Sequence, residues 1–400
     1  MVERIKRFAV KNKLCQYIVN ILFLVYGFLL SVLYLIMRIF PVQDKKVVCC
    51  NMKGKRYGDN PKYITDALLK KDEKYDVVWI LEKNIKEDLP ANVRRVPNNL
   101  LSVTYELATS QIWIDSNTKQ YGTLKRKPQL YIQTWHGSYG LKKVYGDIID
   151  KITFIDKITL KYNSKITDLY ISNSKRTSEI YRRAFWYSGN ILECGSPRND
   201  IFFKDTKPYL ENVQKYFGIQ DKKMALYAPT FRADFGLEAL RLNYENLKKA
   251  LERRFYGEWV ILVRLHPNNI SDAETFIKYN NSVINATPYN NMQELLAVCD
   301  VLITDYSSCM FDFATKNKIC FLYATDVEKY RQERDYYFEL EDLPFPLAQN
   351  NRELEEVILR FDELQYQRDL QKLFTEVGIC ESGEASTCVV DYIEHWRKDK

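Results

Sequence analysis

Short apolar runs alternate with amphipathic stretches along most of the chain after Pro41. The apolar runs are nearly uninterrupted, which is typical of strands that are buried on both faces of a parallel sheet. The stretches between several of them have the spacing of amphipathic helices, as at 61–72 and 174–186. In the first half of the chain the pattern predicts strands at 46–51, 76–81, 111–116, 130–135, 168–173 and 191–195.

A polar stretch then separates this series from a second one. The second series predicts strands at 224–229, 259–266, 283–287, 300–305 and 319–324, with helices at 236–255 and 290–299. Two such series predict an α/β protein with two doubly wound domains, whose ligands bind beyond the carboxyl ends of the strands. The predicted organisation is an N-terminal segment over 1–41, a first Rossmann-like domain over 42–205, a connector over 206–223, and a second Rossmann-like domain with C-terminal helices over 224–400.

The N-terminal segment has no charged residue from Leu14 to Met37. About 20 apolar residues can span a bilayer as a helix. This run is too long for a signal peptide, and no small-residue cleavage site follows it. Basic residues flank both ends, so the positive-inside rule does not give one orientation. We therefore favour a helix that lies in the cytoplasmic leaflet without crossing it, with a single span or a buried core helix as alternatives.

Composition narrows the choice of partners. The formal net charge of +7 fits an anionic membrane surface or a phosphate-bearing ligand. The chain has no recognised nucleic-acid-binding motif and no block rich in Lys and Arg, so we expect no nucleic-acid partner. The nine cysteines form no CxxC pair and no Cys/His cluster with zinc spacing, so we interpret them as reduced core thiols of a cytoplasmic protein.

Two of the three histidines lie at the carboxyl ends of predicted strands, one in each domain. His136 belongs to a Trp-His-Gly turn, and His266 is followed by a proline. If the two domains face each other, both side chains enter the cleft, and we predict that both are functional. A capping or core histidine is the alternative at each position. His395 lies in a C-terminal helix that ends in charges, and we interpret it as structural or exposed.

The stretch 300–318 predicts an anion site in the second domain. A strand ends there in a short polar turn, and the free amides at the start of the following helix favour a phosphate. Arginines after two other strands of this domain would neutralise a diphosphate. An ordinary N-cap and surface ion pairs are the alternatives. The predicted donor-side residues are Arg232, Arg264, Asp305, Ser307, Ser308 and Asp312.

The first domain offers two polar turns, at 54–64 and 193–200, although each could be a simple helix start. The predicted acceptor-side residues are Asp59, Asn60, Gly137, Asn173 and Arg198. The chain contains no DxD, Walker loop, GxGxxG or GxSxG motif. We therefore expect no metal and no cofactor, and assign the charge on the diphosphate to arginines, lysines and helix ends.

Six ordered motifs over roughly 45–390 resemble the CDP-glycerol glycerophosphotransferase family: WHGSYGLKK, SNSKRTSEIYRRAF, GSPRND, YAPTFR, VRLHPNN and DVLITDYSSCMFDFA. The resemblance implies a GT-B-like fold, in which two Rossmann-type domains face a cleft, and attachment to the cytoplasmic face of the cell membrane. It implies transfer of glycerol phosphate from CDP-glycerol to a hydroxyl of an undecaprenyl-linked saccharide acceptor, with release of CMP. The products would be teichoic acid or a related cell-wall or capsular polymer. Homo-oligomerisation stays open.

The resemblance also suggests roles for the histidines. His136 would be the base for the attacking hydroxyl, and His266 would stabilise or protonate the leaving CMP, although the reverse assignment fits almost as well. Here the Trp-His-Gly turn continues as Ser138-Tyr139-Gly140, where the family pattern is closer to Thr-Pro, so we expect a different acceptor pocket. The chain is short for a processive polymerase, which makes a primase or a side-chain transferase at least as strong an expectation. The alternatives are CDP-ribitol as donor, a GT-B glycosyltransferase that uses a sugar nucleotide, and a non-catalytic membrane protein.

Overall fold

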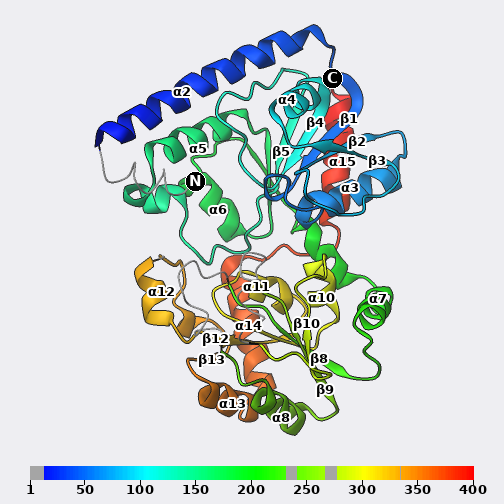
Figure 1. The fold of residues 1–400 in the computed structure, drawn as a ribbon, viewed down its shortest axis with the longest axis vertical. Coiled ribbons are helices and arrows are strands. Elements are labelled where there is room, and N and C mark those ends of the chain that lie inside the picture. The colour runs from blue at the N-terminus through cyan, green and yellow to red at the C-terminus, as the bar shows by residue number, and fades with distance from the viewer. Residues whose placement is uncertain (1–12, 231–240, 266–276, 334) are drawn as a thin grey trace.

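Two α/β lobes are stacked along the long axis of the molecule (Figure 1). The computed structural model describes residues 13–230, 241–265, 277–333 and 335–400. In these residues the first sheet has seven strands and the second has six. Every pairing between the named strands is parallel. The predicted pair of Rossmann-type domains is therefore confirmed.

The first sheet has the order β3-β2-β1-β4-β5-β6-β7, so the strand order reverses between β1 and β4. In a sheet of this kind the reversal opens a crevice at the carboxyl ends of the two strands. The strands are β1 (Gln43–Cys50), β2 (Asp76–Leu81), β3 (Val93–Pro97), β4 (Ser110–Asp115), β5 (Leu130–Gln133), β6 (Leu169–Ser172) and β7 (Asn190–Glu193). The helices of this lobe are α2 (Lys13–Ile36), α3 (Asp59–Lys71), α4 (Leu100–Thr109), α5 (Phe154–Ile166) and α6 (Lys175–Ala184).

Alternate residues of each strand face opposite sides of the first sheet, which explains the continuous apolar runs. Val47 and Cys49 join the core beneath α3, whereas Val48 and Cys50 join the core beneath α4 and α2. Burial on both faces removes the polar positions that a half-exposed strand would show. The sequence signal for these strands is therefore a consequence of the two helical layers.

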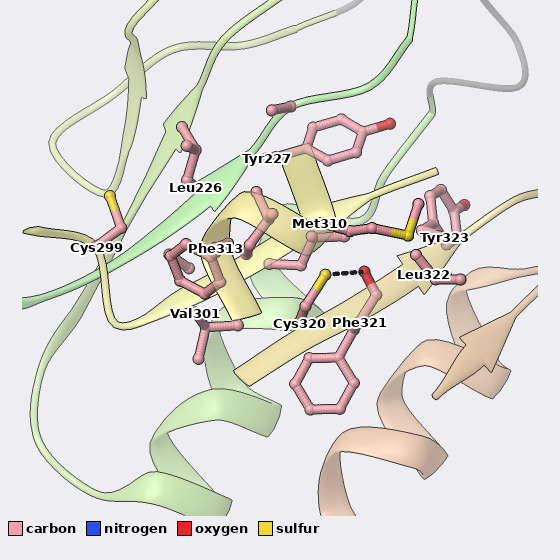
Figure 2. Packing of buried hydrophobic residues seen from close by; sticks show 14 of the residues in the cluster. Leu226, Tyr227, Cys299, Val301, Met310, Phe313, Cys320, Phe321, Leu322 and Tyr323 are labelled. Atoms are coloured by element: carbon pink, nitrogen blue, oxygen red, sulfur yellow. Dashed lines mark hydrogen bonds between the residues drawn. The ribbon is translucent and has the colours of Figure 1, made fainter. Parts of the chain in front are cut away.

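The second sheet repeats the same plan with the order β10-β9-β8-β11-β12-β13. Its reversal lies between β8 and β11, and its core is filled by aliphatic, aromatic and thiol side chains (Figure 2). The strands are β8 (Lys223–Tyr227), β9 (Trp259–Val263), β10 (Val283–Asn285), β11 (Val301–Thr304), β12 (Ile319–Tyr323) and β13 (Leu347–Ala348). The helices are α7 (Lys207–Phe217), α8 (Tyr244–Phe255), α10 (Met292–Val298), α11 (Cys309–Ala314), α12 (Val327–Glu333), α13 (Asn351–Leu359) and α14 (Glu363–Val377).

Cys299 and Cys320 lie within this second core, and all nine cysteines of the chain are free thiols. Burial raises the pKa of the Cys299 thiol to about 12. A thiol with such a pKa stays protonated and behaves as a small apolar group. The interpretation as core thiols therefore holds for the five buried cysteines, whereas the other four are half-buried.

The C-terminal helix α15 (Ala385–Lys398) departs from the predicted organisation. It returns to the first lobe and packs against α3, where Val389 and Ile393 enter the core (Figure 1). The expected boundary at 224–400 therefore assigns this helix to the wrong domain. The connector is also more than a linker, because it contains α7, which packs against α10 of the second lobe.

The apolar N-terminal run forms one long helix, α2, which lies along the outer side of the first lobe (Figure 1). Among the described residues, α2 is the one helix whose length and composition would allow it to cross a membrane. One stripe packs on the lobe: Phe23 stacks on Tyr121, Gly27 lies against the backbone of Gly122, and Tyr34 is buried. The Ser31 hydroxyl donates a hydrogen bond to the Gly122 carbonyl at 3.0 Å. The opposite face is apolar and exposed.

Candidate active site

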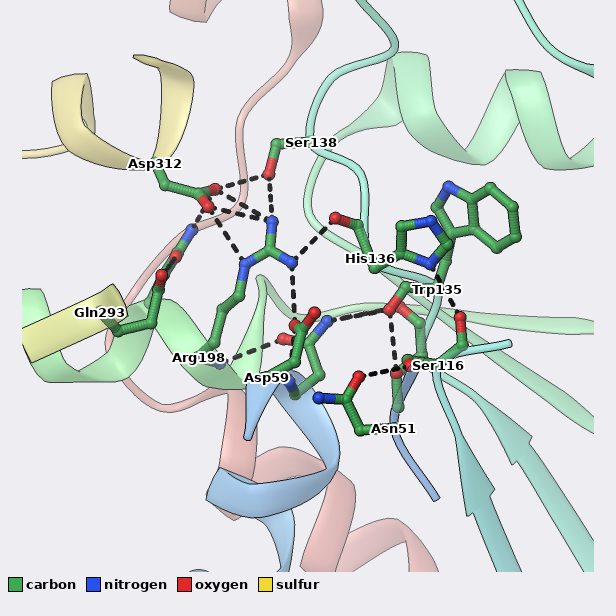
Figure 3. A network of polar contacts seen from close by, with 12 residues as sticks. Asn51, Asp59, Ser116, Trp135, His136, Ser138, Arg198, Gln293 and Asp312 are labelled. Atoms are coloured by element: carbon green, nitrogen blue, oxygen red, sulfur yellow. Dashed lines mark hydrogen bonds and ion pairs between the residues drawn. The ribbon is translucent and has the colours of Figure 1, made fainter. Parts of the chain in front are cut away.

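His136 lies on the loop that follows β5, beside the strand reversal of the first sheet (Figure 3). Its Nδ1 is 2.9 Å from the carbonyl oxygen of Ser116, the residue after β4. A carbonyl can only accept a hydrogen bond, so Nδ1 carries the proton in the neutral ring. The lone pair is then on Nε2, for which the described residues provide no hydrogen-bond donor. This half-buried ring can therefore accept a proton at Nε2.

Trp135 fixes the plane of the histidine ring. The two rings stack with centroids 4.3 Å apart, and the indole also packs edge-on against Phe185 at 4.9 Å. Trp135 has φ of 52°, which is rare for a bulky residue and must be held by its surroundings. Its amide donates to Gln133 Oε1 at 2.9 Å. The loop is thus held in one conformation before any substrate arrives.

Arg198 is the centre of a buried polar cluster that holds this loop (Figure 3). Its Nη1 donates to the backbone carbonyl of His136 at 3.0 Å and to Asp59 Oδ1 at 2.9 Å. Its Nε and Nη2 donate to Asp312 and to the Ser138 hydroxyl. These contacts engage all five N–H groups of the guanidinium. Arg198 was predicted on the acceptor side, but here it positions His136 and has no donor left for a ligand.

Electrostatics keep the Arg198 guanidinium charged. Burial alone would lower the pKa of Arg198, but Asp312 and Asp59 together raise it above the ordinary value. Arg198 is 5% exposed and Asp312 is 3% exposed. A buried cation of this kind is stable only when its carboxylate partners are in place.

Asp59 and Asn60, at the start of α3, hold the same loop from the other side. Asp59 Oδ1 accepts from the Asn60 amide at 2.7 Å as well as from Arg198. Asn60 Nδ2 lies 3.4 Å from the Trp135 carbonyl, and its Oδ1 accepts from the Arg198 amide at 3.1 Å. The structure therefore brings these two predicted acceptor-side residues to the His136 loop as supports.

The cluster also joins the two lobes. Asp312 lies on α11 of the second lobe, and its Oδ1 accepts from the Ser138 hydroxyl at 2.5 Å and from Asn199 Nδ2 at 3.2 Å. Both of its oxygens are occupied by protein donors. Asp312, predicted to bind the donor, is instead an anchor for the loop of the other lobe. Burial raises the pKa of the neighbouring Glu381 carboxyl to about 7, although Ser196 and Asn199 donate hydrogen bonds to it.

The predicted turn after β11 is ordered by its own side chains. Asp305 accepts hydrogen bonds from Thr230, which follows β8, and from the Tyr306 amide. The amides of Met310 and Phe311 donate to the carbonyls of Ser307 and Ser308. Within the described residues, the amides of Ser307 and Ser308 themselves make no hydrogen bond. They are the donors that this turn can offer to an anion.

Arg264 follows β9, and its side chain reaches the segment after β10. It is 8% exposed, and its Nη1 donates to the carbonyls of Ala286 and Tyr289. Burial, with Arg56 of the first lobe as a second cation nearby, lowers its pKa to about 9. In the described part of the chain no carboxylate forms an ion pair with it. A buried guanidinium without a counter-charge favours an anionic ligand.

The remaining predicted residues are distributed as follows. Gly137 lies in the His136 loop, where a Cβ would come 3.1 Å from the Trp135 indole nitrogen. Asn173 follows β6 and accepts from the Thr177 hydroxyl at 3.0 Å, whereas its buried Nδ2 has no partner in the described residues. His266 and Arg232 lie outside the described residues. His395 is exposed on α15, with Nδ1 2.7 Å from the Asp391 carbonyl, as expected for a structural position.

Sequence reasoning missed several members of the site. Ser116 was visible as the last residue of a predicted strand, and its position beside the strand reversal would have marked it. Asn199, Gln293 and Glu381 extend the polar cluster through Asn199 Nδ2–Glu381 and Gln293 Nε2–Asn199 hydrogen bonds of 2.9 and 3.0 Å. No local pattern signals them, since their partners come from distant segments.

Comparison with known proteins identifies the family of the chain. The sequence profile of CDP-glycerol:poly(glycerophosphate) glycerophosphotransferases matches residues 32–395. The chain belongs to this family. The family match confirms the resemblance carried by the six motifs and places the chain among transferases.

Members of the family with curated functions include polymerases of teichoic acid. The chain is 31% identical to a teichoic acid poly(glycerol phosphate) polymerase of Staphylococcus epidermidis, over 88% of this chain but only 51% of that protein. It is 27% identical to the polymerase of the same name from Bacillus spizizenii, over 90% of this chain and 95% of that one. A poly(ribitol-phosphate) polymerase from Bacillus spizizenii is 29% identical over 90% of this chain and 58% of its own length.

Solved structures of one family member share the fold. The wall teichoic acid polymerase TagF superposes with a TM-score of 0.79 at 29% identity, covering 90% of both chains. A histidine-to-asparagine variant of TagF soaked with CDPG gives the same TM-score at 30% identity. The GT-B-like arrangement of the family therefore extends to this chain.

Proposed function

We propose that this protein transfers glycerol phosphate from CDP-glycerol to a hydroxyl of an undecaprenyl-linked saccharide acceptor. The observation that carries the proposal is the geometry of His136, whose Nδ1 lies 2.9 Å from the Ser116 carbonyl and whose Nε2 has no hydrogen-bond partner among the described residues. Nε2 would take the proton of the acceptor hydroxyl while its oxygen attacks the β-phosphorus of CDP-glycerol. The bond from that phosphorus to the CMP oxygen then breaks, and CMP leaves. A positioned base of this kind contributes about 10²–10⁴-fold.

The second lobe would supply the charge that this reaction requires. Phosphoryl transfer depends mainly on positioning and on stabilisation of negative charge. Arg264 and the amides of Ser307 and Ser308 are suited to the diphosphate, because none of them has an anionic partner among the described residues. Arg232 and His266 stay predictions for the same site, with His266 as the group that would stabilise or protonate the leaving CMP.

The acceptor would approach from the first lobe. Asn173 Nδ2 is buried and lacks a partner within the described residues, so it is a candidate donor to an acceptor hydroxyl. By contrast, Ser138 and Tyr139 are buried in the contact between the lobes. This departure from the family pattern therefore supports a difference at the domain interface more than a different acceptor pocket.

We further propose that α2 lies in the plane of the cytoplasmic leaflet. A helix that crossed the bilayer would have to give up the buried stripe at Gly27, Ser31 and Tyr34. An in-plane helix keeps that stripe and inserts its exposed apolar face. The basic residues on both sides of the run then stay on one side of the membrane, which removes the conflict with the positive-inside rule.

The test is release of CMP by the full-length protein in detergent or nanodiscs, with CDP-glycerol, CDP-ribitol or UDP-sugars as donor. The acceptor would be a lipid-linked disaccharide with or without one glycerol phosphate. Release from CDP-glycerol with the bare acceptor indicates a primase, and release only with the primed acceptor indicates an extender or a polymerase. Release from CDP-ribitol alone would change the polymer, and release of UDP alone would replace the proposal with a glycosyltransferase.

The base is tested by His136→Ala, with His395→Ala as the matched control. The expected result is a loss of about 10²–10⁴-fold in kcat for the first variant and no change for the second. Circular dichroism and thermal unfolding verify that both variants are folded. Near-full turnover by folded His136→Ala would show that the base lies elsewhere.

A further inference from the structure

A pocket of about 490 Å³ opens at the C-terminal end of α2, and we call it the α2-end pocket. Its lining combines residues just after α2 with residues of the loop before β5. The lining residues are Arg38, Val42, Lys125, Arg126, Lys127 and Pro128. Four of these six side chains are cationic, so the pocket is strongly basic for its size.

The protein itself does not neutralise most of this charge. Lys125 forms an ion pair with Asp168 at 2.8 Å. The Arg126 guanidinium donates hydrogen bonds to backbone carbonyls, including those of Phe40 and Ala108 at 2.8 and 3.4 Å. In the described residues neither Arg38 nor Arg126 nor Lys127 forms an ion pair with a carboxylate. The Nζ of Lys400 adds another cation where it donates to the Lys127 carbonyl at 2.8 Å.

The crowding of these cations affects their titration. Burial, and then the neighbouring Arg38, hold the pKa of Arg126 below its ordinary value. Burial and the nearby Lys125 lower the pKa of Lys400 in the same way. An anion in the pocket would relieve this repulsion, as phosphate groups do where arginines and lysines converge.

The surroundings of the pocket are apolar and exposed. Ile39 is 76% exposed, and the face of α2 that leads to it shows a continuous band of large apolar side chains. The members of the band are Leu14, Tyr17, Ile18, Ile21, Leu22, Val25, Phe28, Leu29, Val32, Leu35 and Ile36. This arrangement suits a helix that lies in the membrane interface. Lipid acyl chains would contact the apolar band, and lipid headgroups would contact the cations at its end.

The pocket is not part of the reaction site. Pro128 precedes β5 and His136 follows it, so the two lie at opposite ends of the first sheet. At about 3.3 Å per strand residue, the four residues of β5 alone separate them by about 13 Å. The phosphates that react in the cleft therefore do not reach the α2-end pocket.

We propose that the α2-end pocket binds the phosphate of an anionic phospholipid headgroup and, with the apolar face of α2, holds the first lobe flat on the bilayer. This inference rests on the proposed in-plane attachment by α2. The apolar face gives affinity for any bilayer, whereas the pocket gives preference for anionic lipid. The acceptor hydroxyl would then be delivered to His136 at a fixed orientation relative to the membrane.

The experiment is a vesicle partition assay with the full-length protein. Arg38→Gln combined with Lys127→Gln removes two pocket charges. The control combines Arg352→Gln with Lys372→Gln on α13 and α14, exposed positions of the second lobe that give the same change in net charge. Binding is measured to vesicles of phosphatidylcholine alone and of phosphatidylcholine mixed with phosphatidylglycerol, and circular dichroism verifies the fold of each variant.

We expect the pocket variant to lose about 30-fold in partition onto the anionic vesicles, from about fivefold (about 1 kcal/mol) for each of the two basic residues. It should bind neutral vesicles as the wild type does, and the control should match the wild type on both. An equal loss of binding to neutral vesicles, or the same loss in the control variant, would refute the proposal that the pocket binds an anionic headgroup. So would full competition by soluble inorganic phosphate, since that would indicate a site for free phosphate.

Separate measurements report on α2, on the pocket and on the transferase activity. Binding of the wild type to neutral vesicles reports on attachment by α2, and the ratio of anionic to neutral binding reports on the pocket. Release of CMP in detergent reports on the proposed transferase activity and does not depend on either.

Discussion

The contact of Arg198 with Asp312 gives the sharpest test of how the two lobes position His136, the proposed base. Arg198→Met keeps most of the side-chain volume and removes the charge. It leaves the Asp312 carboxylate, 4% exposed, and the Asp59 carboxylate, 18% exposed, without their cation. Breaking a buried ion pair on one side costs about 3–5 kcal/mol, because a buried charge is left uncompensated. We expect Arg198→Met to lower the free energy of unfolding by an amount in that range. The value should lie near its upper end, because two carboxylates lose their cation.

Arg198 has two carboxylate partners, whereas Asp312 has one cationic partner, and this difference predicts which variant loses more stability. Asp312→Leu leaves Arg198 with Asp59 as a partner, so it should cost less than Arg198→Met. The double variant removes the buried charges on both sides and should be more stable than the sum of the single losses predicts, by about 1–3 kcal/mol. Denaturant unfolding of the wild type and the three variants gives this coupling energy. Arg352→Met, which breaks an exposed pair with Glu356, should change stability by no more than about 0.5 kcal/mol.

The same variants separate positioning from folding. Arg198 donates to the backbone carbonyl of His136, so its loss should lower kcat even at temperatures where the variant is fully folded. We expect a fall of about tenfold or more, from the loss of one charge-assisted hydrogen bond of about 1.5–3 kcal/mol. Unfolding of Arg198→Met at the same denaturant concentration as the wild type, or strictly additive losses in the cycle, would show that the cluster does not couple the lobes.

Three further outcomes follow from named contacts. Burial raises the pKa of Glu381 from 4.5 to about 7, so its stabilising contribution is complete below pH 4.5 and is lost as the pH rises through 7. Urea unfolding should give a wild type that is less stable at pH 8 than at pH 5 by up to about 3 kcal/mol from this group, with a smaller difference in Glu381→Gln. Gly27→Val should lower the melting temperature, because a Cβ there would lie 2.3 Å from Tyr121 Cδ1. Gly58→Ala should leave the melting temperature unchanged, because a Cβ there would lie 3.8 Å from Asn51 Nδ2, an ordinary contact distance. Arg264→Gln should raise the KM for the CDP-linked donor by about 10–100-fold, measured by CMP release.

Most of the strands that the sequence predicted are buried on both faces, with the edge strands β7 and β10 as the exceptions. β3 and β13 were missed for opposite reasons. In β3 the two central residues, Arg94 and Arg95, are exposed, so this edge strand has no apolar run. β13 has only two residues and exists because β12 provides a partner for it. Edge strands depend on their neighbours more than on their own composition, and a single sequence does not report those neighbours.

In the candidate site, too, the sequence predicts residues that local features mark and misses roles that depend on distant partners. His136 could be predicted because it follows a buried strand and precedes a glycine, and both are local features. The function of Arg198 could not, because its partner Asp312 is 114 residues away in the sequence. Nothing local distinguishes an arginine that binds a ligand from one that fills a polar cluster. The return of α15 to the first lobe was invisible for the same reason, since its amphipathic pattern fits either lobe.

One short segment connects the chemistry to the domain contact. Its first part carries His136, and three residues later Tyr139 is fully buried against Phe311 of α11, with ring centroids 5.4 Å apart. Gly140 completes the turn with φ of 69°, and a Cβ there would lie 2.2 Å from Ile180 Cδ1. Residues of both lobes therefore hold this segment, with Ile180 from the first lobe and Phe311 from the second. A change in how the lobes dock would reach the His136 loop through Ser138 and Tyr139, because both are buried in the contact with α11.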